Sequence, residues 1–106
     1  MTEGLDRLFA TIAARKDADP DRSYTARLLA AGVEKCAKKF GEEATETVIA
    51  AIKQDKTELA KESADLLYHL AVLWAASGIT PQDVYAVLQS REGMSGLEEK
   101  ASRPKS

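Results

Sequence analysis

The sequence contains little cysteine and no large excess of either charge, and both scarcities exclude classes of protein. Cys36 is the one cysteine among 106 residues, which excludes an intramolecular disulfide and a thiolate metal site within one chain. The net charge of −2 offers no basic surplus for a nucleic-acid surface. We therefore expect a protein of a reducing compartment, the cytoplasm, with no nucleic-acid partner.

Long hydrophobic runs and an amino-terminal targeting pattern are also missing. No apolar run approaches the roughly 18 residues that a membrane-spanning helix needs. The amino terminus has no basic flank followed by an apolar stretch, as a secretory signal would have. We expect a protein that has no membrane partner.

Glycine and proline are scarce in the middle of the chain, where Ala, Leu, Glu and Lys dominate. These residues favour helix, and no stretch shows sustained alternation of β-branched residues. We predict an all-α fold, a helical bundle of about five helices that forms one domain over residues 1–91. Residues 92–106 are polar and rich in Ser, Gly and Lys, which predicts a mobile tail.

Capping residues and apolar spacing predict where the helices begin and end. Ser23 and Asp55 are typical N-caps, and Gly78 is typical of a helix end. The string TPQD, Thr80 to Asp83, resembles a capping arrangement with Pro81 at the first helical position. The predicted helices cover residues 3–16, 24–31, 33–54, 56–77 and 81–91.

The helix predicted over residues 56–77 is apolar almost all round. Its one polar strip contains Glu58, Glu62, Asp65 and His69. Such a helix is normally enclosed, so we expect the strip to face an internal cleft. We also expect a homodimer or a higher oligomer to cover the remaining apolar surface. On the helix over residues 33–54, one apolar stripe is predicted from Val33, Cys36, Ala37, Phe40, Ala44, Thr47, Val48 and Ala51.

Two pairs of acidic residues carry the strongest chemical signal. Glu43 and Glu46 stand three apart on one predicted helix, and Glu62 and Asp65 stand three apart on the next. Residues three apart share a helix face, so two such helices side by side would bring four carboxylates together. Their repulsion favours a bound cation, and oxygen ligands suit Mg²⁺ first and Mn²⁺ next. Carboxylate-held Mg²⁺ is typical of phosphoryl or nucleotidyl transfer.

Two other interpretations compete with a magnesium site. The acidic pairs could belong to solvated helix faces with ordinary ion pairs. A di-iron centre would need Glu-x-x-His on two helices, but the chain has one histidine and its pairs end in Glu46 and Asp65. The residues therefore favour a redox-inert cation over iron and leave the solvated face open.

Lys35, Lys38 and Lys39 form a basic cluster within two turns of the acids. They could make ordinary helix ion pairs, Lys38 with Glu42 and Lys39 with Glu43, or they could bind phosphate groups. The spacing favours neither.

Four further residues have less specific signals. Tyr24 suits packing or a hydroxyl that faces a ligand, and His69 is more typical of a hydrogen-bonded structural residue than of a ligand. Cys36 and Trp74 fall on apolar stripes, which predicts core positions.

Three strings carry a resemblance to a known family: SYTARLL at 23–29, KCAKKFGEEATE at 35–46 and ESADLLYHLAVLW at 62–74. The spaced ExxE and ExxD pairs resemble the all-α nucleotide pyrophosphohydrolases, which include MazG-like and dimeric dUTPase-like enzymes. The three strings together are most similar to the phosphoribosyl-ATP pyrophosphohydrolase family, over roughly residues 4–91. The resemblance implies Mg²⁺-dependent hydrolysis of 1-(5-phosphoribosyl)-ATP to 1-(5-phosphoribosyl)-AMP and pyrophosphate, the second step of histidine biosynthesis.

The resemblance also implies roles for individual residues. Glu42 would be a further metal ligand or would orient the attacking water. The implied metal ligands are Glu43, Glu46, Glu62 and Asp65, the implied phosphate-binding residues are Lys35, Lys38 and Lys39, and Tyr24 and His69 are further candidates for substrate binding. A nucleotide pyrophosphatase that clears free or damaged nucleoside triphosphates, and a non-catalytic helical dimerisation module, remain the alternatives.

Overall fold

The computed structural model describes residues 2–93 and 96–103, and over these residues the chain is built from helices alone. The molecule is elongated, with principal extents of 47 × 34 × 30 Å. Its helices are α1 Thr2–Ala14, α2 Tyr24–Ala31, α3 Val33–Ile52, α4 Lys56–Ser77, α5 Pro81–Ser90 and α6 Gly96–Ser102. The predicted all-α class is confirmed, and the bounds of the five predicted helices agree with α1 to α5 to within about two residues.

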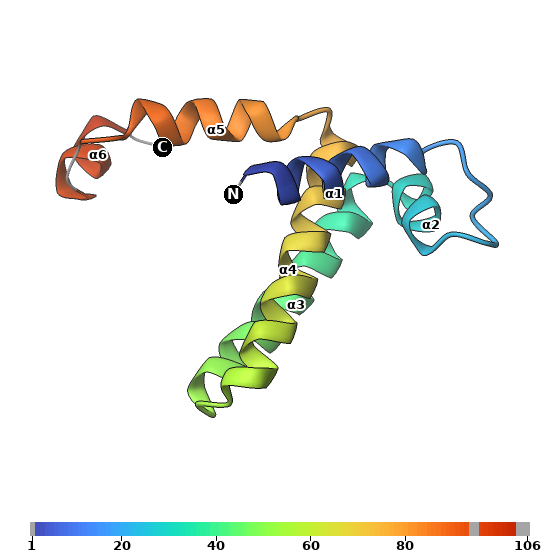
Figure 1. Ribbon diagram of the computed structural model, residues 1–106, viewed down its shortest axis with the longest axis horizontal. Helices are drawn as coiled ribbons and strands as arrows, with labels where there is room; N and C mark the ends of the chain where they lie inside the picture. The colour runs from blue at the N-terminus through green and yellow to red at the C-terminus, as the bar shows by residue number, and fades with distance from the viewer. Residues whose placement is uncertain (1, 94–95, 104–106) are drawn as a thin grey trace.

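The two longest helices, α3 and α4, form an antiparallel hairpin that extends away from the other helices (Figure 1). A turn over residues 53–55 joins them, and Gln54 adopts a positive φ of 59° there. Asp55 then caps α4, because its side chain accepts a hydrogen bond from the Glu58 amide at 3.0 Å. The hairpin therefore holds the two acidic segments on neighbouring helices.

The other predicted caps are present as well. Ser23 accepts a hydrogen bond from the Ala26 amide at 3.1 Å and begins α2. Thr80 and Asp83 form a capping box at the start of α5, where Pro81 takes the first helical position. Gly78 ends α4 in the left-handed conformation, with φ of 77°, which a residue with a side chain rarely adopts. Local chemistry thus accounts for the limits of these helices.

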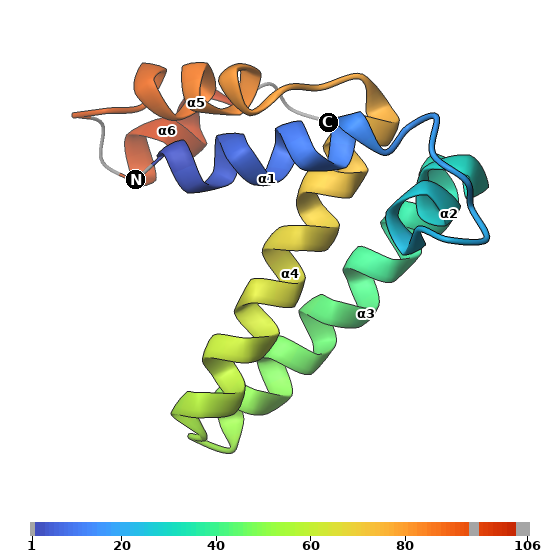
Figure 2. The ribbon, with the colours of Figure 1, turned by 45° about the vertical axis from the view of Figure 1, so that its right-hand side comes forward.

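The hydrophobic core lies at the end of the hairpin where α1 and α2 pack against it (Figure 2). Ile12 of α1 is 1% exposed, and it packs in one buried cluster with Leu28, Cys36, Ala71 and Val72. Trp74, at 9% exposed, is buried near the same end of α4. Both core predictions, Cys36 and Trp74, are confirmed.

The apolar stripe predicted for α3 is partly wrong. Cys36 is buried, and Phe40, Ala44 and Thr47 are half-buried, whereas the other four residues are exposed: Val33, Ala37, Val48 and Ala51. The side of α3 that faces α4 instead includes Glu43 and the buried Ala50. The reason is that one antiparallel neighbour buries a narrow seam, and the crossing of the two helices decides which residues line it.

The enclosure predicted for α4 holds for part of the helix. Ala71, Val72 and Trp74 are buried, but Leu67 remains 49% exposed. The polar strip does face inward at two positions, because Glu62 and His69 are buried, while Glu58 is exposed. The homodimer that would cover the remaining apolar surface stays a prediction.

Helix α5 extends beside α1, where the Tyr85 hydroxyl donates to Asp6 at 3.0 Å (Figure 2). Helix α6 lies in the segment that we predicted as a tail, so the described residues contain one helix more than the five whose ranges we predicted. The predicted mobility of residues 92–106 remains a prediction, and residues 94–95 and 104–106 lie outside the described part. Each helix over residues 2–93 and 96–103 is too short or too polar to cross a membrane.

Candidate metal and phosphate site

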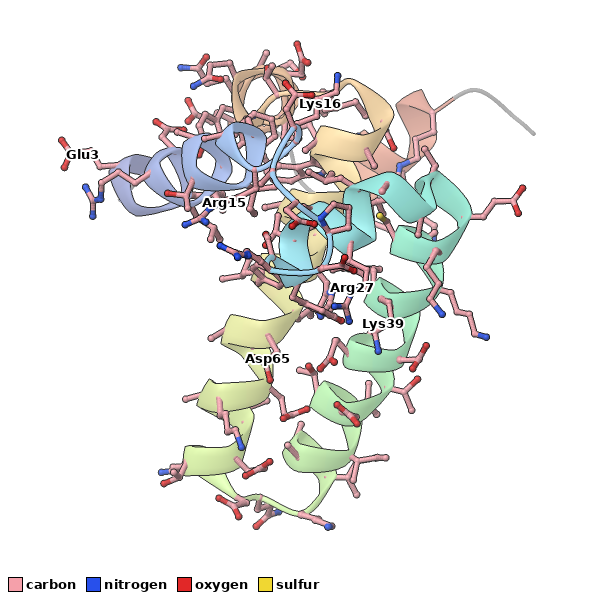
Figure 3. The ribbon with its side chains drawn as sticks, turned by 90° about the vertical axis from the view of Figure 1, so that its right-hand side faces the viewer. Glu3, Arg15, Lys16, Arg27, Lys39 and Asp65 are labelled. Atoms are coloured by element: carbon pink, nitrogen blue, oxygen red, sulfur yellow. The ribbon has the colours of Figure 1, made fainter. Side chains whose placement is uncertain are left out.

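Three carboxylates from the two hairpin helices meet between them. Glu43 of α3 and Glu62 and Asp65 of α4 each offer an oxygen, and these oxygens lie within 4.8 Å of one another. Figure 3 shows Asp65 on the side of α4 toward α3, with Lys39 of α3 across the same gap. Glu62 is 7% exposed, so one member of the group is almost fully removed from water.

Glu46 lies beside this group. It is an exposed residue of α3, and it lies close enough to Glu43 and Glu62 to raise the pKa of both. All four acids predicted as metal ligands are therefore neighbours.

Thr47 joins the two helices at the level of the acids. Its hydroxyl lies 2.8 Å from the Glu43 carbonyl, one turn earlier on α3, and 3.3 Å from the Glu62 carbonyl on α4. It can donate to either carbonyl, and this places the backbones that carry the two glutamates at a set distance. The sequence analysis counted Thr47 as part of an apolar stripe. The one signal of this contact was the position of a threonine on the side of a helix that faces its predicted hairpin partner.

The environment disfavours negative charge on two of the acids. Burial, and then hydrogen bonding and repulsion from Glu46, raise the pKa of Glu43 above its ordinary value of 4.5, while the charge on Lys39 opposes the rise. Hydrogen bonding to Glu46, and then burial and repulsion from the other acids, raise the pKa of Glu62. A positive charge therefore stabilises closely placed acids with raised pKa values more than it stabilises dispersed acids.

The donor set fits a small divalent cation. Mg²⁺ holds its oxygens at about 2.1 Å, so two ligand oxygens around one ion are at most about 4.2 Å apart. The present limit of 4.8 Å is close enough for small side-chain rotations to close the difference. Oε2 of Glu43 is buried and has no hydrogen-bond partner among the described residues, which is what a ligand oxygen awaiting a cation would show.

The basic residues differ in how close they come to the acids. Lys39 lies one turn before Glu43, and its ammonium is 3.6 Å from Glu42 Oε1. This ion pair, Lys39 with Glu42, differs from the two pairs that the spacing suggested, which were Lys38 with Glu42 and Lys39 with Glu43. Lys35 and Lys38 are exposed residues of α3.

Tyr24 and His69 occupy the side of the site next to α2. The Tyr24 ring is edge-on to the His69 ring, with centroids 6.2 Å apart. Tyr24 is 48% exposed and can meet a ligand, but His69 is 6% exposed. Nε2 of His69 lies 3.9 Å from Glu43 Oε1, so the imidazole faces Glu43 from the side of the site next to α2.

Sequence reasoning did not single out Arg27. Figure 3 shows this α2 residue on the same side of the molecule as Lys39 and Asp65. Its Nε donates to the Pro20 carbonyl at 3.2 Å. A basic residue inside the string SYTARLL was the available signal.

Comparisons with known proteins agree on one family. A family model described as phosphoribosyl-ATP pyrophosphohydrolase matches residues 5–92. The chain belongs to this family. A protein of Parvibaculum lavamentivorans named phosphoribosyl-ATP pyrophosphatase is 65% identical over 99 residues, which cover 93% of this chain and 91% of the relative. Proteins with the same name from Paracoccus denitrificans and Cereibacter sphaeroides are 61% and 60% identical, over 94% and 93% of this chain and 93% and 96% of the relatives.

The family match covers every site residue described above, from Tyr24 to His69, and ends at residue 92. Pyrophosphohydrolases of this kind typically depend on a metal ion, and the group of Glu43, Glu62 and Asp65 could hold one. The clustered acids of the α3–α4 hairpin and the nearby ring of Tyr24 thus lie within the segment that the family model matches.

Proposed function

We propose that this chain hydrolyses 1-(5-phosphoribosyl)-ATP to 1-(5-phosphoribosyl)-AMP and pyrophosphate, the second step of histidine biosynthesis. The observation that carries the proposal is the family match over residues 5–92, which includes all the clustered acids. In this reaction one water is added across the bond between the α- and β-phosphoryl groups. Its oxygen joins one phosphorus, and the bridging oxygen leaves with the other.

Mg²⁺, or Mn²⁺ in its place, is the proposed cofactor, and Glu43, Glu46, Glu62 and Asp65 are the proposed ligands. The convergence of these oxygens, the raised pKa values of Glu43 and Glu62 and the unpartnered Oε2 of Glu43 support this assignment. When bound, such an ion neutralises charge on the pyrophosphate and makes a bound water easier to deprotonate.

The protein residues around the acids would bind and orient the reactants. Glu42 is half-exposed at the edge of the site, where it is proposed as a further ligand or as the carboxylate that orients the attacking water. Lys39 is the best placed of the three lysines for a phosphate group, since its ammonium already lies beside an acid of the site. Lys35, Lys38 and Arg27 are proposed for more distant phosphate oxygens.

Tyr24 is the remaining proposed substrate contact. It stands at the N-terminus of α2, half-exposed, with one edge of its ring on the buried His69. This position suits stacking against a base or a hydrogen bond to a sugar hydroxyl. The burial of His69 fits a contact with Glu43 better than a contact with substrate.

Pyrophosphate release from phosphoribosyl-ATP and from a panel of nucleoside triphosphates, in Mg²⁺ and in EDTA, tests the proposal. We expect kcat/KM for phosphoribosyl-ATP to exceed that for each ordinary triphosphate by at least about 100-fold, because the ribosyl phosphate adds charged contacts. We expect EDTA to abolish release. Equal rates across the panel would favour a general nucleotide pyrophosphatase, and no release from any substrate would favour a non-catalytic helical module.

A further inference from the structure

His69 is the one histidine of the chain, and it lies behind the acids without a clear role in catalysis. Its ring is enclosed by α2 and α4, with the Tyr68 ring edge-on at a centroid distance of 5.0 Å and the Tyr24 ring at 6.2 Å. Tyr68 is itself held by a hydrogen bond with the Thr25 hydroxyl of α2. The imidazole is therefore kept in place by its neighbours, and solvent reaches 6% of it.

The two nitrogens of this ring have different surroundings. Nε2 lies 3.9 Å from Glu43 Oε1, whereas Nδ1 is buried with no hydrogen-bond partner among the described residues. An imidazole carries its proton on Nε2, on Nδ1 or on both nitrogens. A carboxylate accepts hydrogen bonds, so the proton is more stable on the nitrogen that faces Glu43.

The two carboxylate oxygens of Glu43 also have different surroundings. Oε1 faces His69, and Oε2 is buried without a partner. A separation of 3.9 Å is too long for a hydrogen bond, but a movement of about 1 Å would close it to the usual 2.9 Å. A carboxylate anchored through one oxygen has its other oxygen aimed in a defined direction.

We propose that His69 is a positioning residue, which donates a hydrogen bond from Nε2 to Glu43 Oε1 and thereby aims Glu43 Oε2 at the divalent cation. This inference rests on the metal site of the proposed function. It assigns His69 a place behind a ligand and not in contact with substrate. Its consequence is that metal affinity depends on which ring nitrogen is replaced.

Two substitutions separate the nitrogens. His69→Gln places an amide N–H near the position of Nε2, and His69→Asn places one near Nδ1. We expect the dissociation constant for Mn²⁺, measured without substrate by electron paramagnetic resonance, to rise at least about 10-fold in His69→Asn and less than about 3-fold in His69→Gln. Equal affinities in wild type and His69→Asn, or equal losses in both variants, would overturn the proposal.

Tyr85→Phe is the matched control for a general loss of stability. It removes the hydrogen bond from Tyr85 to Asp6 between α5 and α1, outside the site. We expect it to lower the melting temperature and to leave Mn²⁺ affinity unchanged. If wild type and Glu62→Gln both bind no Mn²⁺ and release no pyrophosphate, the proposed function itself fails, which is a different result from failure of the histidine variants alone.

The tautomer of His69 gives a second readout that needs no substitution. Because the chain has one histidine, the imidazole nitrogen-15 signals in a spectrum of the untagged protein belong to His69. We expect the proton on Nε2, and we expect the Nε2 signal to change on addition of Mg²⁺ as the hydrogen bond shortens. A proton on Nδ1 in the Mg²⁺-loaded protein would contradict the proposal even if His69→Asn did not fold.

Discussion

The end of the α3–α4 hairpin that carries Cys36, Ala71 and Val72 is covered by α1 and α2, whereas the end that carries Ile52 has no such cover in residues 2–93 and 96–103 (Figure 2). At the covered end the buried residues are apolar. Toward the open end the buried residues include Glu62, and Ile52 is 75% exposed. The packed apolar core and the clustered acids thus lie in different parts of the same two helices.

The difference explains how the acids can be close together without unfolding the chain. The repulsion between the acids destabilises the hairpin. The packed core at the other end of the hairpin offsets this loss of stability. The acids lie between the two ends. Burial and the neighbouring Glu46 raise the pKa of Glu43, and hydrogen bonding to Glu46 and burial raise that of Glu62, whereas Asp65 is not buried. Four experiments would break or sharpen this comparison.

The largest expected effect is on stability at the covered end. Ile12→Ala removes a side chain that is 1% exposed and leaves a cavity, so we expect the free energy of unfolding to fall by about 2–5 kcal/mol, measured by urea denaturation in EDTA. The matched variant Ile52→Ala should change it by less than about 0.5 kcal/mol. A large, concentration-dependent loss in Ile52→Ala would instead show that a second copy covers the open end, as the predicted homodimer would.

The acids should show the opposite pattern, with loss of activity and not of folding. Asp65→Asn and Glu46→Gln remove charge without removing volume, and we expect each to lower kcat/KM at least about 100-fold while circular dichroism shows the same helix content. Glu34→Gln is the control, because it makes the same chemical change at the exposed N-terminal end of α3. Near-normal turnover in Asp65→Asn would remove the site from this part of the hairpin.

A smaller effect distinguishes a metal site from a solvated acidic face. Glu62→Gln relieves repulsion in the metal-free protein, so we expect it to melt a few degrees higher than wild type in EDTA. Millimolar Mg²⁺ should raise the melting temperature of the wild type through preferential binding to the folded state, and should raise that of the variant much less. Equal, salt-like shifts in both proteins would contradict the convergence of the acids.

The smallest effect is on the pH dependence of stability without metal. Glu43 and Glu62 have pKa values above 4.5 in the folded protein, so between 4.5 and the raised values the folded state binds more protons than the unfolded state. Stability must therefore fall as the pH rises through this range. We expect a shallower fall in Glu62→Gln, measured as melting temperature against pH in EDTA. The lowered pKa of His69 acts in the opposite direction below pH 6.5 and is present in both proteins.

Much of the fold was predictable because the relevant signals are local. Ser23, Asp55, Thr80 and Gly78 act on amides and carbonyls within a few residues, and all four occupy the predicted helix ends. The acidic pairs were also readable, because a spacing of three places both members on one face. Helix α6 was not predicted, since its seven residues carry too little periodic pattern to exceed the tail-like composition around it.

The inner face of α3 could not be read in the same way. Val48 is more hydrophobic than Glu43 and Thr47, yet Val48 is 56% exposed and the other two are half-buried. Hydrophobicity ranks residues for burial, but the site requires polar groups in the seam and so departs from that ranking. The contact between Glu43 and His69 across the hairpin could not be predicted either, because it also places polar groups in the seam between α3 and α4.

The sequence by itself determined the helix limits, the helical class and the presence of two acidic pairs, because each depends on residues within one or two turns. Only the tertiary structure decided that Glu43 meets Glu62 and Asp65, that Thr47 faces the Glu62 carbonyl, and that His69 lies behind Glu43. These contacts join different helices. They depend on how the hairpin crosses and on the core that holds its other end, and no local pattern encodes either.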